Sequence, residues 1–318
     1  KNKIMREFNL QKGSSFIENA LNVKNNFWRY VLGIFIIFIF TQIGSIPFII
    51  AIFNKVGIEG AANLDPSKMM TILENSNLTF FYTLLTFFIG FIGFLIVIKY
   101  LHNQSVLSIT TSRKTIDYKR ILTSFTAISV ILVLNILFSF FTSSEEYILQ
   151  FNLNDFLILL LIAVIFIPIQ TSLEEYVFRG YLMQGFGVMF NNKWLPLILT
   201  SFSFGFLHFY NPEIMKLGSI LLVHYVATGL FLGILTLMDD GMELALGFHA
   251  GNNLLIALIV TADWTVFQTT SIFKYIGEPN VINQSLFSLS IIYPILLFYF
   301  SRKYNWTNWK DKLTGKVK

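Results

Sequence analysis

The sequence contains no cysteine and few charged residues. Without cysteine, the chain forms no disulfide bond and offers no thiolate ligand to a metal ion. Only 13% of its 318 residues are charged, whereas 54% are hydrophobic, 35 are phenylalanine and the mean hydropathy is +0.63. A soluble domain of this length does not bury so large an apolar fraction. The composition therefore predicts a protein that crosses a membrane several times.

The scarce positive charges lie mainly in the terminal segments and in one loop. The net charge is +5, and this distribution is typical of the positive-inside rule, so no nucleic-acid partner is expected. Residues 1–26 mix Lys and Arg with apolar side chains. They form either a basic amphipathic stretch on an anionic membrane face or an ordinary cytoplasmic tail. We expect residues 27–302 to form one transmembrane bundle and residues 303–318 a basic cytoplasmic tail.

Eight apolar runs are long enough, or nearly so, to cross a bilayer. They cover residues 28–53, 79–101, 121–142, 156–173, 194–209, 217–238, 244–261 and 286–301. The sequence thus predicts an all-α polytopic membrane bundle of about eight transmembrane helices, with no second domain. Pro47 is expected to kink or end the first helix. The first run is too long for a cleavable signal peptide.

Loop charges predict the orientation. With the N-terminus in the cytoplasm, the basic loop between the second and third helices and the basic C-terminal tail also face the cytoplasm, and the opposite loops carry mostly acids. Both termini are therefore predicted to be cytoplasmic. The heavy use of Lys, Asn, Ile and Phe is typical of an AT-rich bacterial genome. We accordingly expect a multi-pass protein of the bacterial plasma membrane.

Glu174, Glu175 and Arg179 are three charges within an apolar stretch. A charge at bilayer depth costs roughly 2.5–3.5 kcal/mol on insertion scales, so such residues usually face a protein interior or water and serve a function. Arg179 lies four residues after Glu175, which is the favourable spacing for an ion pair on one helix face, but five after Glu174. The spacing predicts a structural Glu175–Arg179 pair. Glu174 is left free for chemistry, unless both acids merely lie at a solvated helix end.

Two histidines and an amide occur in other apolar runs. His208 stands in the fifth run, where a single histidine is more often a packing residue than a catalyst. His249 and Asn253 are four residues apart and point from one helix face, with Gly251 between them allowing another helix to approach closely. Each signal is weak alone. An acid, two histidines and an amide on three helices form a set that packing does not require.

These residues can meet only if they lie at similar depths in the bilayer. His208 and His249 lie near the middle of a hydrocarbon core of about 30 Å if their helices start at the cytoplasmic face. A fourth helix that starts flush with the outer face leaves Glu174 at the cytoplasmic boundary. We therefore expect that helix to continue through Arg179 to about Gln184 and to break at Gly185 and Gly187.

Assembled together, these groups suit hydrolysis. Glu174 would act as general base on a water, helped by His208. His249 and Asn253 would stabilise the oxyanion of the tetrahedral intermediate, which is worth about 3–4 kcal/mol per donor in known cases. The alternative is a zinc ion held by Glu174, His208 and His249. No His-Glu-x-x-His helix is present, so a metal is less favoured and no cofactor is expected.

The polar residues form three short motifs in the sequence: Glu174-Glu175-Tyr-Val-Phe-Arg179, Phe204-Gly-Phe-Leu-His208 and His249-Ala-Gly-Asn-Asn253. In type and order they resemble the motifs Glu-Glu-x-x-x-Arg, Phe-x-x-x-His and His-x-x-x-Asn of the CPBP intramembrane proteases. This family is also called the CAAX protease, bacteriocin-processing or Abi family. The resemblance covers roughly residues 170–255. It implies a CAAX-endopeptidase-like fold, water activation by Glu174 and His208, and an oxyanion hole formed by His249 and Asn253.

We therefore predict an intramembrane endopeptidase in the lipid bilayer that acts on a membrane-associated peptide or protein. Within the family, maturation of peptide pheromones or bacteriocins, or self-immunity, suits a bacterial chain better than prenylated substrates do. The alternatives are a non-catalytic bacteriocin-immunity or scaffold protein and, third, a proton-coupled transporter.

Two further polar groups receive other interpretations. His224 matches none of the motifs, and a packing role is favoured over cavity lining. Asp239, Asp240 and Glu243 are expected to form a solvated acidic turn.

Overall fold

The computed structural model describes residues 15–64, 70–278 and 285–317. Apolar helices dominate it, which confirms the all-α membrane bundle. Six of them are long and apolar enough to cross a membrane: Phe27–Ala62, Ser76–Leu101, Tyr118–Thr142, Leu153–Phe190, Ile220–Asp239 and Ser285–Lys303. Two shorter apolar helices are α7 (Trp194–Leu207, 14 residues) and α10 (Glu243–Ile259, 17 residues). All eight predicted runs are thus helical, but two are short of a full span.

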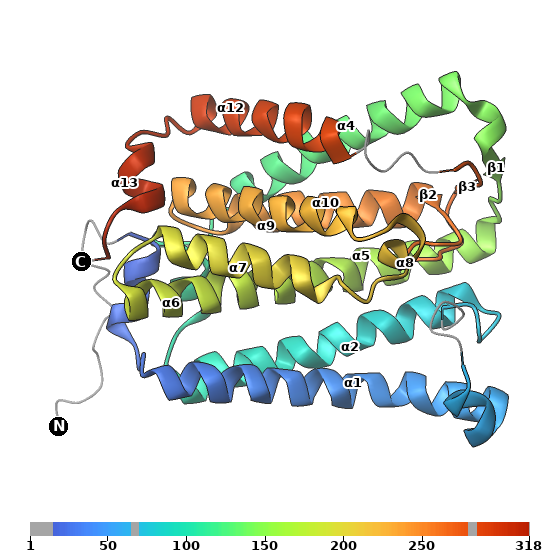
Figure 1. The fold of residues 1–318 in the computed structure, drawn as a ribbon, viewed down its shortest axis with the longest axis horizontal. Coiled ribbons are helices and arrows are strands. Elements are labelled where there is room, and N and C mark those ends of the chain that lie inside the picture. Colours follow the sequence, from blue (N-terminus) through green and yellow to red (C-terminus); the bar gives the residue numbers. More distant parts are fainter. Residues whose placement is uncertain (1–14, 65–69, 279–284, 318) are drawn as a thin grey trace.

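The peripheral helices carry the lipid-facing surface. α1 (Phe27–Ala62) and α2 (Ser76–Ile96, extended by the π-helical η3, Val97–Leu101) lie side by side along one edge of the bundle, and α4 (Tyr118–Thr142) and α12 (Tyr293–Lys303, preceded by η6, Ser288–Ile292) lie along the other (Figure 1). Phe35, Phe141 and Phe298 on these helices are 57%, 80% and 64% exposed. Large apolar side chains exposed in this way are covered by lipid in a membrane.

The central helices position the polar residues. α5 (Leu153–Glu175), the π-helical η5 (Tyr176–Leu182) and α6 (Met183–Phe190) form one continuous helix. α7, α9 (Ile220–Asp239) and α10 pack around it (Figure 1). Three buried apolar clusters, centred on residues such as Leu173, Leu235 and Ala163, fill the space between these helices.

Helix ends depart from the predictions at two places. α1 does not end at Pro47; its helical backbone is interrupted at Gly57, which adopts φ 72° and ψ 173°. The fourth predicted helix continues past Arg179 as required, but it does not break at Gly185 or Gly187. It ends at Phe190, and the following residue, Asn191, is left-handed at φ 53°. Proline at position 47 is tolerated because neighbouring groups in a membrane bundle compensate for the lost hydrogen bond.

Short elements close the two ends of the bundle. At one end lies a three-stranded sheet of order β1-β3-β2, with β1 (Tyr147–Leu149) antiparallel and β2 (Val260–Thr261) parallel to β3 (Phe273–Tyr275). These strands are too short to show an alternating pattern of hydrophobic residues, so the sequence does not predict them. The remaining short helices are η1 (Ile17–Asn22), α3 (Val106–Thr110), η4 (Ser144–Glu146), α8 (Pro212–Leu217) and α13 (Trp309–Thr314).

Both terminal segments pack against the same end of the bundle. η1 contacts α6; Ile17, its first residue, and Phe16, which precedes it, are each 1% exposed. α13 contacts α7 and α9, and Val317 N–H donates to Asn191 O at 3.3 Å. The described parts of segment 1–26 and of the tail 303–318 therefore belong to the folded bundle. Residues 1–14 and 318 lie outside the described part of the chain.

The acidic turn between α9 and α10 is buried, so the expectation of a solvated turn was wrong for two of its three acids. The side chains of Asp239 and Glu243 are 1% and 0% exposed. Arg113 lies 3.0 Å from Asp239 Oδ2 and 3.1 Å from Glu243 Oε2, and Arg120 also pairs with Asp239. Two arginines from the basic loop and the start of α4 compensate the desolvated carboxylates.

Candidate active site

Glu174 reaches the middle of the bundle because its helix is long. It lies 16 residues before Phe190, which places it roughly 24 Å from that end of the helix at 1.5 Å per residue. His208 follows the end of α7, 14 residues after Trp194, or roughly 21 Å along the antiparallel neighbour. The depth condition on the fourth helix is thus met, and acid and histidine lie at similar heights.

Glu175 and Arg179 form the predicted ion pair. Arg179 Nη1 donates to Glu175 Oε1 at 2.9 Å, and both side chains are completely buried. The guanidinium also donates through Nη2 to Gly229 O at 3.3 Å and lies 4.3 Å from the centre of the Phe204 ring. The pair therefore ties η5 to α7 and α9.

Glu175 also binds His249, a contact that sequence reasoning missed. His249 Nδ1 lies 2.8 Å from Glu175 Oε1, while Nε2 lies 3.6 Å from Glu174 Oε2. Because a carboxylate only accepts, Nδ1 carries the proton of that hydrogen bond. The imidazole is held between the two neighbouring acids. Glu175 and His249 are 74 residues apart in sequence, so no local pattern could have indicated the contact.

Gln170 joins Glu174 to Asn253. Its Nε2 donates to Glu174 Oε1, and its Oε1 accepts from Asn253 Nδ2 at 3.2 Å. Asn253 Oδ1 in turn accepts from Asn252 Nδ2 at 3.1 Å. These bonds leave one hydrogen of Asn253 Nδ2 available to another acceptor. Gln170 was not a predicted site residue, although a polar side chain one helical turn before Glu174 was a signal that could have found it.

The second oxygen of Glu174 is buried and has no hydrogen-bond partner among the described residues. Buried carboxylate oxygens are almost always hydrogen-bonded, and exceptions occur at sites that bind water, ions or substrate. Glu174 Oε2 faces His249 Nε2 at a distance too long for a hydrogen bond. The carboxylate thus presents a free acceptor at the centre of the site.

His208 is placed next to this centre by Phe204. The Phe204 ring lies 4.7 Å from the His208 ring and 6.0 Å from the His249 ring, measured between centroids. His208 Nδ1 donates to Phe204 O at 2.8 Å, so in the neutral ring Nε2 carries the lone pair. The His208 ring also stacks on the Tyr225 ring, with 4.1 Å between centroids. His208 is therefore oriented by its own helix end and by α9.

His224 lies one step further from the centre. Its ring is 6.2 Å from that of Tyr225 and 6.3 Å from that of Tyr293, and its buried Nδ1 has no partner within the ranges that the structure describes. The ring contacts fit the packing role favoured from the sequence, whereas the Nδ1 that is unpartnered among the described residues does not fit a histidine whose hydrogen bonds are satisfied.

Glycines bring α10 close to α4. A side-chain carbon at Gly247 would lie 2.1 Å from Ile121 O, and one at Gly251 would lie 2.8 Å from Ile128 Cγ2. The backbones of the two helices thus meet directly on the side of α10 that carries these glycines. This contact fixes the rotation of α10 and hence the direction of His249 and Asn253.

No group of three or more His, Asp and Glu side chains in the described ranges has the arrangement of a metal site. His249 and His208 engage Nδ1, with Glu175 and with Phe204 O respectively. Nε2 of each ring is therefore left to meet either a water or a metal ion, because metal-binding histidines commonly donate their other ring N–H in this way.

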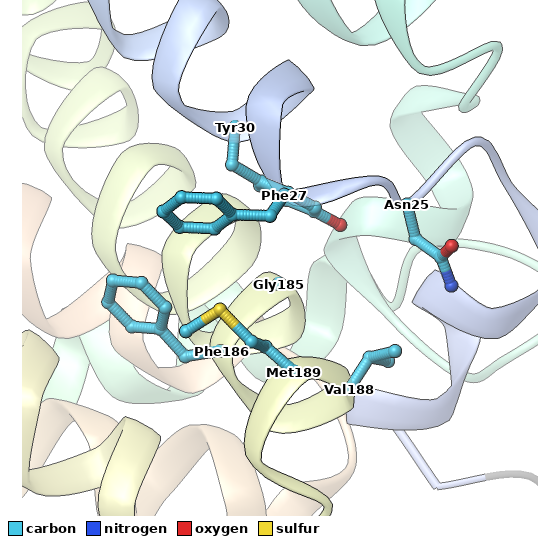
Figure 2. A pocket seen from close by; sticks show the side chains of 7 residues that line it. All are labelled: Asn25, Phe27, Tyr30, Gly185, Phe186, Val188 and Met189. Atoms are coloured by element: carbon cyan, nitrogen blue, oxygen red, sulfur yellow. The ribbon is translucent and has the colours of Figure 1, made fainter.

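A separate pocket of about 220 Å³ lies between the start of α1 and α6. Phe27 and Tyr30 face Phe186 and Met189 across it (Figure 2). None of the candidate catalytic residues lines this pocket. It is therefore distinct from the site around Glu174.

Comparisons with known proteins identify a family for part of the chain. Residues 153–255 match the family described as type II CAAX prenyl endopeptidase, Rce1-like. This segment contains all three motifs, and the match confirms the resemblance to the CAAX protease family. The chain is also 25% identical over 280 residues to the uncharacterized protein YyaK of Bacillus subtilis (strain 168), covering 87% of this chain and 92% of that protein. No solved structure matches. The sequence and fold thus define a multi-pass membrane protein with a CAAX-protease-like segment.

Proposed function

We propose that this protein is an intramembrane endopeptidase that hydrolyses a peptide bond in a membrane-associated peptide or protein. The observation that carries the proposal is the unpartnered, buried Oε2 of Glu174, 3.6 Å from His249 Nε2. The family match over residues 153–255 supports the same reaction class.

Glu174 and His208 activate the water in this proposal. A water held by Glu174 Oε2 transfers a proton to that oxygen as its own oxygen attacks the scissile carbonyl carbon. The lone pair on His208 Nε2 assists in orienting and deprotonating the water. When the carbon–nitrogen bond breaks, the proton passes from the carboxyl to the leaving amine. Gln170 keeps the other carboxylate oxygen engaged, so that Oε2 alone meets the water.

Asn253 and His249 stabilise the oxyanion in this proposal. Asn253 Nδ2 has one hydrogen beyond the one it gives to Gln170. His249 donates from Nε2 only when both ring nitrogens carry protons, because Nδ1–H is committed to Glu175. The proposal therefore requires the imidazolium form of His249 during the reaction, with the carboxylate of Glu175 as its counter-charge.

In this proposal the site lies within the bilayer and not in a water-filled cleft at the surface. The described termini pack at one end of the bundle, and the basic loop lies at that end too, since Lys24 N–H donates to His102 O at 3.0 Å. We infer from the loop charges that this end faces the cytoplasm of a bacterial cell. The substrate is a peptide embedded in or lying on this membrane.

Glu174→Gln is the direct test. The amide keeps the volume of the side chain and the acceptor for Gln170 but cannot take a proton from water. Removing a general base typically lowers turnover by about 10²–10⁴-fold. Membrane proteomes of cells that produce the wild type or this variant are compared for a peptide that is no longer cut. Glu278→Gln, at a carboxylate that is 89% exposed, is the control for loss of one negative charge.

The other two functions give different results in the same cells. A non-catalytic immunity or scaffold protein keeps its phenotype in Glu174→Gln at a normal protein level, and that result would reject the endopeptidase. A transporter produces proton-coupled flux in liposomes without peptide cleavage.

A further inference from the structure

Glu213 is a buried acid in the turn that follows His208. It lies in α8, between the end of α7 and the start of α9, and the residue is 8% exposed. Its Oε1 accepts from Val266 N–H at 2.7 Å, which ties the turn to the loop after β2. Its Oε2 is buried and has no hydrogen-bond partner in the described part of the chain.

No described cation compensates Glu213. Lys216, on the same short helix, lies 3.4 Å from Glu278 instead. Burial raises the pKa of Glu213, and only hydrogen bonds to backbone N–H groups act against that shift. A carboxylate buried without a counter-charge is costly and is rarely kept for packing alone.

Tyr225 connects Glu213 to the reaction centre. Its ring stacks on His208 at 4.1 Å. Both Glu213 and Glu174 lie close enough to the phenol to interact with it electrostatically. Both carboxylates therefore act electrostatically on the side chain that stacks on His208.

The surface around this turn carries exposed apolar side chains. Leu207, Tyr210 and Met215 are 67%, 87% and 63% exposed, although they flank His208 and Glu213. A peptide that approaches His208 over this surface exchanges water for protein around its polar groups, which then need partners in the protein.

We propose that Glu213 binds a cationic group of the substrate, an ammonium or a guanidinium, next to the scissile bond. The inference rests on the proposed endopeptidase function. The cation would donate to the free Oε2, while Val266 N–H continues to hold Oε1. Hydrogen bonds that involve a charged group are the stronger ones, so this contact selects among apolar peptides that differ in one charge.

The experiment measures cleavage specificity with the full-length protein in lipid nanodiscs. The probe is a quenched-fluorescence peptide library on one apolar sequence, in which a single Lys, Arg or isosteric norleucine moves along the chain. Each peptide is made with a free and with an acetylated N-terminus. Wild type, Glu213→Gln, Glu213→Arg and Glu174→Gln are compared. Asp263→Asn, at an acid that is 75% exposed in the nearby loop, is the matched control.

The expected result is a preference of about tenfold to a hundredfold for Lys or Arg over norleucine at one position. Glu213→Gln loses this preference but still cuts the norleucine peptides, because the amide retains an acceptor for Val266 N–H. Glu213→Arg disfavours the basic peptides, and Asp263→Asn behaves as wild type. If the preference requires a free N-terminus and disappears on acetylation, the cation that Glu213 binds is the terminal ammonium of the peptide.

Two results overturn the inference in distinguishable ways. If the wild type cuts the library without preferring a cation, or if Glu213→Gln keeps the preference, then Glu213 is not the cation site and the endopeptidase stands. If the wild type cuts no peptide faster than Glu174→Gln does, the proposed function itself fails, and the inference fails with it.

Discussion

Glu175 accepts a hydrogen bond from His249 Nδ1 at 2.8 Å, and the same oxygen, Oε1, accepts from Arg179 Nη1 at 2.9 Å. A residue predicted only to support the fold thus also holds a candidate catalytic histidine. The two roles can be separated because Arg179 stabilises the buried charge, whereas His249 uses it for orientation.

Replacing Arg179 with methionine should destabilise the protein by roughly 3–5 kcal/mol, because it leaves Glu175 buried without its counter-charge. The double variant Glu175→Gln/Arg179→Met should recover much of that loss, since no unpaired charge remains. It should nevertheless remain poorly active, because His249 then lacks a carboxylate at Nδ1. Thermal unfolding in detergent and peptide cleavage measure the two effects. Full activity in the double variant would show that Glu175 acts only through Arg179.

Gln170 should matter for turnover more than for stability. Methionine at this position removes the bridge between Glu174 and Asn253 while nearly keeping the volume. Two side chains then lose their fixed rotamers, and we expect cleavage to fall about 10–100-fold through loss of positioning. The protein level should change little. Gln42→Met, at an exposed position of α1, is the control, and an unchanged kcat in Gln170→Met would contradict the assigned role.

Excess chelator should leave peptide cleavage intact. The proposed reaction uses Glu174 and His208, without a metal ion, to activate the water. Cleavage is measured before and after prolonged dialysis against EDTA and phenanthroline. Activity that is lost and then restored by stoichiometric zinc would favour the metal alternative with Glu174, His208 and His249 as ligands.

Local contacts were predictable from the sequence, and distant ones were not. The four-residue spacing of Glu175 and Arg179 predicts their ion pair because both lie on one helix face. Apolar runs predict the helices for the same local reason. The partners of Asp239, by contrast, include Arg113, which is 126 residues away. An acidic turn that is expected to be solvated from the sequence is therefore buried in the fold.

The candidate site likewise combines features that the sequence predicts with features that it does not. The motifs indicate Glu174, His208, His249 and Asn253, but which nitrogen of His249 is engaged follows only from the packing of α10 against α5. The π-helical turn at Tyr176–Leu182 has no pattern in the sequence, although it lies directly after the two acids. Such turns often occur at functional sites.

His102 gives a prediction for the pH dependence of stability. It is completely buried just past the second membrane span, with Nδ1 2.7 Å from Lys24 O and Nε2 2.7 Å from Tyr181 Oη. Burial lowers the pKa of His102 below its ordinary value of 6.5. The folded protein therefore binds this proton less readily than the unfolded chain does.

The sign follows from that difference. The stability that neutral His102 contributes is complete above pH ~6.5 and is lost as the pH falls below it, by at most about 1.4 kcal/mol per pH unit. The thermal midpoint of the wild type should thus fall more steeply between pH 7.5 and 5.5 than that of His102→Gln. Glu213, whose pKa burial raises, acts with the opposite sign, but it is present in both proteins and cancels in the comparison. Equal slopes in the two proteins would mean that His102 is protonated as readily in the folded state as in the unfolded chain.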